Sequence, residues 1–191
     1  MTPHIINKEN NFIAGWYQKD TSICDRLIEY HKNDNLKEPG RIRTGVDTSF
    51  KDSTDCVILD QELLVEYADY LQAALCEYVE LYSYVNGFDP WAITEGVNIQ
   101  HYAPNQAYHG WHTERAGASF PVRNRHLVFM TYLNDVTDQG ETEWFYQKVK
   151  IKPEKGLTVF WPVDWSFVHR GIPSPSQDKY ISTGWYSYLE N

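Results

Sequence analysis

The sequence predicts a mainly β domain, a β-sandwich or jelly roll, that follows two N-terminal helices. Two amphipathic helical patterns lie in the first half of the chain. Past Trp91 the sequence changes to short runs rich in β-branched and aromatic residues, with turn signals between them. A chain of 191 residues fits one domain. We expect residues 1–90 to form a helical support and lid segment and residues 91–191 to form the jelly-roll core.

The first helix is expected from Thr21 to His31, where Ile23, Leu27 and Ile28 lie on one stripe and Asp20 or Thr21 is the candidate cap. The second is expected from Asp60 to Tyr82. Its apolar residues keep helical spacing over about six turns, and they are Leu64, Tyr67, Ala68, Leu71, Leu75, Tyr78, Val79 and Tyr82. Between the helices, Asn33 to Asp60 is polar and irregular, as in a lid, a binding loop or a plain surface connection.

Six strands are expected in the second half. Turns such as Asp138-Gln139-Gly140 and Pro153 to Gly156 separate them. The expected strands are Val97–Tyr102, His126–Leu133, Glu143–Lys150, Leu157–Trp161, Ser166–His169 and Tyr180–Leu189.

The composition limits the class of protein. With 42% hydrophobic and 15% aromatic residues the chain is a folded protein, and its net charge of −9 argues against nucleic acid as a partner. No apolar run approaches the roughly 18 residues that span a bilayer, and the N-terminus lacks the layout of a secretory signal. The three cysteines show no close pairing and are expected to be reduced thiols. We therefore expect a cytoplasmic protein without a membrane partner.

Two histidines and a carboxylate form the candidate metal site. His112-Thr113-Glu114 is the one H-x-[DE] triplet in the chain, although 7 His and 26 acidic residues make about one such triplet expected by chance. On an extended segment, residues at i and i+2 share a face, so both side chains can enter one cavity, and His169 completes the set. Two imidazoles and one carboxylate suit Fe(II) with open positions. Catalytic zinc stays open from ligand type alone, whereas structural zinc would want a fourth ligand.

Four stretches resemble the prolyl-4-hydroxylase-like branch of the 2-oxoglutarate/Fe(II) dioxygenases. Residues 125–136, RHLVFMTYLNDV, are similar to the central strand of that family. Residues 140–144, 152–161 and 169–185 match further motifs in the same order, so the resemblance covers about Asn98 to Tyr188. The spacings agree too, because Tyr102 lies ten residues before His112 and Lys179 ten residues after His169.

The resemblance implies a double-stranded β-helix, the cupin-like jelly roll, with iron held by His112, Glu114 and His169. It implies that Lys179 pairs with the 5-carboxylate of 2-oxoglutarate and that the hydroxyls of Tyr102 and Tyr132 help to hold this co-substrate. It also implies that Trp185 packs beside the pocket. The expected cofactors are Fe(II), 2-oxoglutarate and O₂, and ascorbate is implied by the resemblance alone.

The expected reaction is hydroxylation of an unactivated C–H bond, with succinate and CO₂ as co-products. A prolyl residue in a peptide is the substrate that the family suggests, and a free amino acid or small metabolite is the alternative. A non-catalytic jelly-roll binding module is the rival from another class. The family usually has Asp at the position of Glu114. A carboxylate at this position argues against halogenation, and the longer side chain of Glu leaves the orientation of the carboxylate open. One of Arg115, Arg123 and Arg125 is a candidate for substrate contact, and the alternative is a solvated or salt-bridged loop charge.

Overall fold

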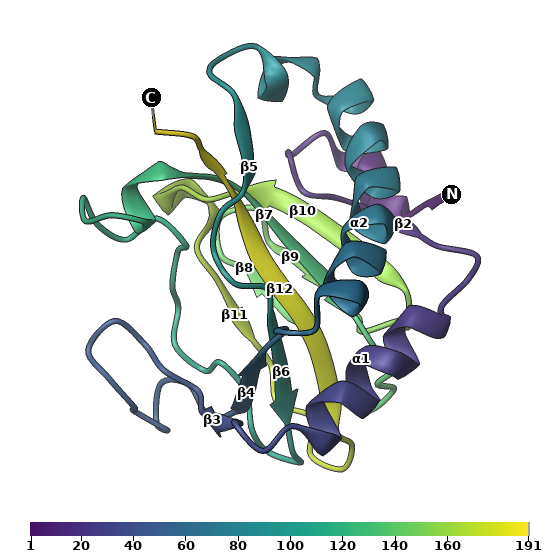
Figure 1. Cartoon of the computed structure of the whole chain (residues 1–191), viewed down its shortest axis with the longest axis vertical. Coiled ribbons are helices and arrows are strands. Elements are labelled where there is room, and N and C mark those ends of the chain that lie inside the picture. Colours follow the sequence, from purple (N-terminus) through teal and green to yellow (C-terminus); the bar gives the residue numbers. More distant parts are fainter. Residues whose placement is uncertain (191) are drawn as a thin grey trace.

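The computed structural model describes residues 1–190 and shows a large sheet, a small sheet and two long helices (Figure 1). The helices are α1 (Ser22–Asn33) and α2 (Gln61–Leu81), and short 3-10 turns are η1 (Ile5–Glu9), η2 (Ser83–Asn86), η3 (Val122–Asn124) and η4 (Trp165–Phe167). The strands are β1 (Thr2–Pro3), β2 (Ala14–Tyr17), β3 (Glu38–Pro39), β4 (Thr54–Val57), β5 (Trp91–Ile93), β6 (Asn98–Tyr102), β7 (Arg125–Tyr132), β8 (Thr142–Trp144), β9 (Val149–Ile151), β10 (Leu157–Pro162), β11 (His169–Gly171) and β12 (Lys179–Tyr188).

Two antiparallel sheets confirm the predicted mainly β fold. The large sheet has the order β1-β2-β10-β7-β12-β6-β4-β3, with β5 pairing to β12, and the small sheet has the order β11-β8-β9. β7 lies between β10 and β12 and is buried over most of its length. Alternate residues of β7 enter different cores. Phe129 packs toward the helices, and Met130 packs into the interior between the sheets.

Both predicted helices are present with nearly the predicted ends. The side chain of Asp60 accepts a hydrogen bond from Leu63 N at 3.0 Å and caps α2. The buried side of α2 includes Tyr67, whose hydroxyl donates to Thr131 Oγ1 of β7 at 2.8 Å. Figure 1 shows α1 and α2 on one face of the large sheet, with β8, β9 and β11 behind it.

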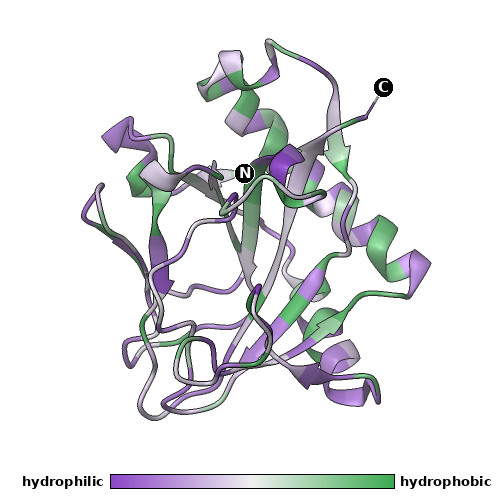
Figure 2. Cartoon of the chain, turned by 90° about the vertical axis from the view of Figure 1, so that its left-hand side faces the viewer, coloured by the Kyte–Doolittle hydropathy of each residue, from purple (hydrophilic) through white to green (hydrophobic). Residues whose placement is uncertain are grey.

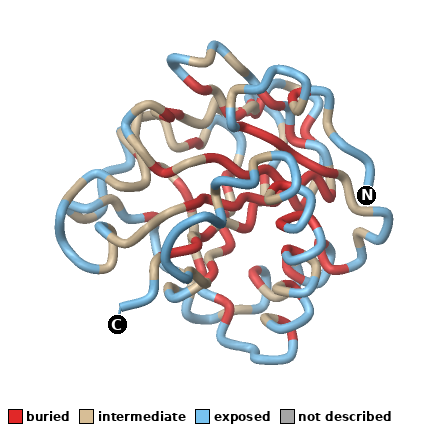
Figure 3. Tube along the Cα trace, turned by 90° about the horizontal axis from the view of Figure 1, so that it is seen from above, coloured by how far each residue is buried: buried red, intermediate tan, exposed pale blue. Residues whose placement is uncertain are grey.

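The hydropathy and burial of the chain follow these layers. Hydrophobic and hydrophilic residues alternate along the strands and helices, and much of the loop backbone is hydrophilic (Figure 2). The central strands are buried, and exposed residues lie at the periphery (Figure 3). None of the helices in residues 1–190 is both long enough and apolar enough to cross a membrane.

Two strand predictions need correction. The expected strand Glu143–Lys150 is a hairpin, because Phe145 to Lys148 form the turn between β8 and β9 and Lys148 adopts a φ of 55°. The expected strand Ser166–His169 is a 3-10 turn followed by β11, which starts at His169. Aromatic residues such as Phe145 favour strands by composition, yet here they occupy a surface turn.

The first 90 residues contribute strands as well as helices. β2 pairs with β10, and β4 pairs with β6, so both extend the large sheet. β3 and β4 lie within the segment from Asn33 to Asp60 that the sequence predicts as irregular. Strands of two to four residues show too little alternation of polar and apolar residues to be recognised in a sequence. They form because neighbouring strands pair with them.

Candidate active site

The two candidate histidines are neighbours because their backbones pair. His112 N donates to His169 O at 3.0 Å, and His169 N donates to His112 O at 2.9 Å. His169 begins β11, whereas His112 lies in a connecting segment outside the named strands. This isolated antiparallel bridge sets the two imidazoles side by side, with ring centroids 4.2 Å apart.

Donor atoms of His112, Glu114 and His169 converge on one point. Glu114 Oε1 lies 3.6 Å from His112 Nε2 and 3.2 Å from His169 Nε2. One ligand atom from each residue lies within 4.8 Å of the others. About one seventh of the side-chain surface of His112 and of Glu114 is exposed. The cluster therefore offers three donors on one side and an approach from solvent on the other.

Backbone carbonyls orient both imidazoles. His112 Nδ1 lies 3.0 Å from Gly110 O, and His169 Nδ1 lies 3.0 Å from Phe167 O. A carbonyl accepts, so each Nδ1 carries a proton, and each Nε2 faces Glu114, where it ligates a metal once it has no proton of its own. Burial, followed by the neighbouring His169, lowers the pKa of His112. The neutral form is the one that can ligate a metal.

One carboxylate oxygen of Glu114 accepts a hydrogen bond from Trp185, and the other oxygen faces the two histidines. Trp185 Nε1 donates to Oε2 at 3.0 Å, which leaves Oε1 at the centre of the cluster. Burial by itself raises the pKa of Glu114. Contacts with His112 and His169 outweigh burial and hold that pKa well below its ordinary value. Glu114 is therefore an ionised carboxylate that presents one oxygen to the cluster.

Arg125 holds this arrangement from behind. Its guanidinium donates twice to Glu95, at 2.8 and 2.6 Å, and lies 3.4 Å from the centre of the Trp185 ring. Arg125 Nη1 also donates to the backbone carbonyl of Glu114 at 2.9 Å. These contacts join β7, β12 and the loop after β5. Because they bring together segments that are separate in the chain, no sequence pattern indicates that Glu95 pairs with Arg125. The sequence places Trp185 beside the pocket, and the structure adds its hydrogen bond to Glu114.

The three arginines that follow the first histidine are all in ion pairs. Arg115 pairs with Asp164 at 2.5 Å, and Arg123 pairs with Glu190 at 2.9 Å. Arg125 pairs with Glu95. Each of the three arginines is therefore salt-bridged, and contact with substrate stays a prediction.

Tyr108 is a site residue that the sequence reasoning missed. Its ring stacks on the imidazole of His112, with centroids 3.6 Å apart and planes 7° apart. Tyr108 lies in the loop before His112, and its backbone carbonyl accepts from Gly171 N in β11 at 2.8 Å. The stack depends on the path of this loop, for which the sequence holds no periodic pattern. It fixes the plane of the His112 ring.

Lys179 is a buried cation at the first position of β12, where it pairs with Tyr102 of β6. Its Nζ donates to Gly140 O at 3.1 Å and lies 4.9 Å from the centre of the Tyr102 ring. Burial lowers the pKa of Lys179 to about 8, and no carboxylate within residues 1–190 forms an ion pair with it. A buried ammonium without a counterion destabilises the fold, so the site suits an anionic ligand.

The two candidate tyrosines have different surroundings. The hydroxyl of Tyr102 donates to Gln100 Oε1 at 2.7 Å, beside Lys179. The hydroxyl of Tyr132 donates to Thr142 Oγ1 of β8 at 2.8 Å and also lies 3.3 Å from Ile151 O of β9. Both hydroxyls thus have partners in the protein, and each would have to exchange that partner or share it with a ligand.

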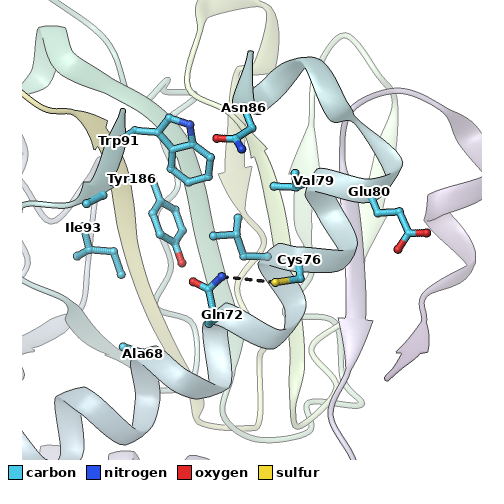
Figure 4. Close-up of a pocket in the computed structure, with 11 residues that line it drawn as sticks. Ala68, Gln72, Cys76, Val79, Glu80, Asn86, Trp91, Ile93 and Tyr186 are labelled. Atoms are coloured by element: carbon cyan, nitrogen blue, oxygen red, sulfur yellow. Dashed lines mark hydrogen bonds between the residues drawn. The ribbon is translucent and has the colours of Figure 1, made fainter. Parts of the chain in front are cut away.

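A groove of about 680 Å³ on the other face of the large sheet is separate from this site (Figure 4). Its walls come from α2, β5 and Tyr186 of β12. Tyr186 belongs to the core beneath the helices, whereas its neighbour Trp185 faces the interior between the sheets. Successive residues of a strand point to opposite faces, so the groove and the His112 cluster lie on opposite sides of the sheet.

Comparison with known proteins relates the segment that carries the cluster to a protein family. Residues 97–187 match the family model described as the 2OG-Fe(II) oxygenase superfamily, and this segment contains all six candidate site residues. No curated protein sequence matches the chain. The family match supports a 2-oxoglutarate- and Fe(II)-dependent oxygenase, as the resemblance implies.

Solved structures show the same fold. A viral collagen prolyl hydroxylase from Paramecium Bursaria Chlorella virus-1, in complex with 2OG, has 21% identity and a TM-score of 0.69, and the match covers 95% of this chain and 98% of that one. A Pseudomonas putida prolyl-4-hydroxylase has 14% identity and a TM-score of 0.72 over 95% of each chain. A Trichoplax adhaerens prolyl hydroxylase with a hypoxia-inducible-factor peptide has 15% identity and a TM-score of 0.72 over 96% and 87%. At identities this low, the structural similarity establishes the jelly-roll fold alone.

Proposed function

We propose that this 2-oxoglutarate/Fe(II)-dependent dioxygenase hydroxylates a prolyl residue in a peptide. The observation that carries the proposal is the convergence of His112 Nε2, Glu114 Oε1 and His169 Nε2 on one point, in a chain whose residues 97–187 match the oxygenase family. Similarity in fold to three prolyl hydroxylases, one of them with a bound peptide, supports the choice of substrate.

The donor set fits Fe(II). Two neutral imidazoles and one carboxylate oxygen form a face of three ligands, and Trp185 occupies the other oxygen of Glu114. When bound, the metal and 2-oxoglutarate supply the oxidising chemistry that activates O₂ and attacks the C–H bond, with succinate and CO₂ as co-products. The protein holds its three ligands still through Gly110 O, Phe167 O and the Arg125–Trp185 pair.

Lys179 is proposed to anchor the far carboxylate of 2-oxoglutarate. The anion would neutralise a buried ammonium whose one hydrogen-bond acceptor within residues 1–190 is the Gly140 carbonyl. Tyr102 lies against the same ammonium and would donate its hydroxyl to the incoming carboxylate in place of Gln100. At the metal end of the site, Trp144 and Trp161 lie against His169, with ring centroids 6.0 and 5.1 Å from its imidazole, and exclude water there.

The test is an anaerobic titration of the protein with Fe(II) and then with 2-oxoglutarate. We expect a weak visible charge-transfer band when both are bound. Admission of O₂ with a proline-containing peptide should then give succinate and a peptide heavier by one oxygen atom. His169→Ala should lose the band, because the metal loses a ligand. Succinate formation with a free amino acid and with none of the peptides would replace the prolyl substrate with a small metabolite. A bound chelate that never yields succinate would favour the non-catalytic module.

A further inference from the structure

A groove between α2 and β5 lies on the face of the large sheet opposite to the metal-binding cluster. It measures about 680 Å³, and Figure 4 shows its walls. Leu75 and Val79 of α2 and Ile93 of β5 make its lining mainly apolar. We call it the α2–β5 groove. A concave apolar surface of this size has the form of a binding site, because monomeric proteins cover such surfaces or use them.

The floor of the groove holds a polar group that the protein leaves unpaired. Tyr186 is 6% exposed, and its ring packs edge-on against Trp91 with centroids 5.2 Å apart. Its hydroxyl points between β5 and α2, and it forms no hydrogen bond with any group in residues 1–190 (Figure 4). The amide of the neighbouring Gln72 donates instead to Cys76 Sγ at 3.4 Å. A buried hydroxyl without a partner is unfavourable, so the groove suits an occupant with polar groups of its own.

The helix beside the groove carries acidic side chains and no basic ones. The sequence has neither lysine nor arginine between Lys51 and Arg115, and α2 lies within this stretch. Among the acidic residues of α2, Glu66 alone forms an ion pair within residues 1–190, and its partner is Arg26 of α1. The exposed acidic residues of α2 are Glu62, Glu66, Asp69, Glu77 and Glu80.

These five residues form a stripe along the solvent side of α2, which we call the acidic stripe. Glu62 and Glu66 are four residues apart, and Glu77 and Glu80 are three apart, so like charges are neighbours on the helix surface. Such pairs slightly destabilise a helix, so the stripe does not serve the stability of α2. Glu80 also lines the groove, and its side chain points away from the floor (Figure 4). The stripe therefore runs along the rim of the α2–β5 groove.

We infer that the α2–β5 groove and the acidic stripe bind a basic amphipathic helix of a partner protein. The apolar side of that helix fills the groove, and its lysines and arginines, spaced three or four residues apart, face the acidic stripe. A lysine or arginine that reaches the floor donates to the unpaired hydroxyl oxygen of Tyr186.

The charge of the surface excludes the other common occupants of an apolar groove. An anionic membrane and a nucleic acid are both repelled by the acidic stripe. Two copies of this chain that met through the same groove would bring two acidic stripes together, and like charges across an interface are costly. The basic helix is the occupant that both the apolar hollow and the negative rim favour.

Cys76 reports directly on the occupancy of the groove. It is exposed and lines the groove, whereas Cys24 and Cys56 are buried, so a maleimide labels Cys76 first. The probe is a synthetic helix of about 18 residues, with leucines on one side and lysines on the other, about as long as α2. One control peptide has the same residues in scrambled order, and another has glutamate at each lysine. Fluorescence anisotropy measures binding to the full chain, and the rate of maleimide labelling measures protection.

The lysine helix should bind, should protect Cys76 from labelling, and should bind more weakly as the NaCl concentration rises. Glu80→Lys should raise its dissociation constant about three- to tenfold, as for the reversal of one exposed charge pair. Glu38→Lys is the matched control, because it makes the same change at an exposed residue of β3, at the end of the large sheet. It should leave the dissociation constant unchanged.

Equal binding of the scrambled or glutamate peptide, an unprotected Cys76, or equal losses in the two variants would overturn the basic helix as occupant. A dimer in light scattering that protects Cys76 without any peptide would identify a second copy of the chain as occupant and would also overturn it. Hydroxylation should be the same in Glu80→Lys and in the unmodified protein, since the groove and His112 lie on opposite sides of the sheet. Failure of the basic helix would therefore leave the proposed function intact.

Discussion

Lys179→Met tests whether the buried ammonium is kept for a ligand at the expense of stability. The burial that lowers the pKa of Lys179 from its ordinary value of 10.5 to about 8 penalises the charged form in the folded protein. The difference corresponds to about 3 kcal/mol at pH 7. Methionine removes this penalty with a side chain of similar length. It also leaves the Gly140 carbonyl without its donor, which costs about 1 kcal/mol.

The net expectation is that Lys179→Met raises the free energy of unfolding by about 2 kcal/mol at pH 7, or Tm by about 4–8 °C. The pH dependence has a defined sign. Because the folded pKa lies below the unfolded pKa, the penalty in the unmodified protein is complete below pH 8 and shrinks as the pH rises from 8 toward 10.5. The advantage of the variant should therefore fall to near zero by about pH 10.

The assay is urea unfolding followed by tryptophan fluorescence at pH 7 and pH 10, without metal or 2-oxoglutarate. Lys152→Met, at an exposed lysine, controls for the methionine itself. A destabilised Lys179→Met at pH 7, or an effect that is the same at both pH values, would refute the idea that Lys179 is an uncompensated charge. Adding Fe(II) and 2-oxoglutarate should stabilise the unmodified protein and give much less stabilisation in the variant, because the anion loses its partner.

Further outcomes follow from the same geometry. His112→Ala and His169→Ala should each abolish Fe(II) binding measured by anaerobic equilibrium dialysis, and full retention in either would remove that residue from the ligand set. Trp185→Phe keeps the ring on Arg125 but loses the 3.0 Å hydrogen bond to Glu114, so Fe(II) affinity should fall about ten- to a hundredfold with little change in Tm. Glu114→Asp should keep more activity than Glu114→Ala, and the reverse ranking would contradict direct ligation. The dissociation constant of 2-oxoglutarate should be flat below pH 7 and rise about tenfold per pH unit above 8, as Lys179 loses its proton; a flat profile up to pH 9.5 would move the anchor elsewhere.

The sequence carries local information well where a pattern is long. The α2 repeat extends over 21 residues, so its helix and its buried side could be predicted. The hairpin of β8 and β9 was predicted as one strand, since composition alone does not show that Phe145 and Tyr146 occupy a turn. The short strands β2 and β4 exist because β10 and β6 pair with them, and pairing across the sheet leaves no mark on a segment of four residues.

The sequence by itself determined the chemical inventory of this protein: two histidines, a carboxylate and a lysine at spacings that match an oxygenase family, on a chain that folds mainly as β-sheet. The tertiary structure decided how that inventory is used. The bridge between His112 and His169, the hydrogen bond from Trp185 to Glu114 and the pairing of Arg125 with Glu95 join segments that lie far apart in the chain. Such contacts arise when strands pair across sheets, whereas residue type and spacing report only the local preferences of the backbone.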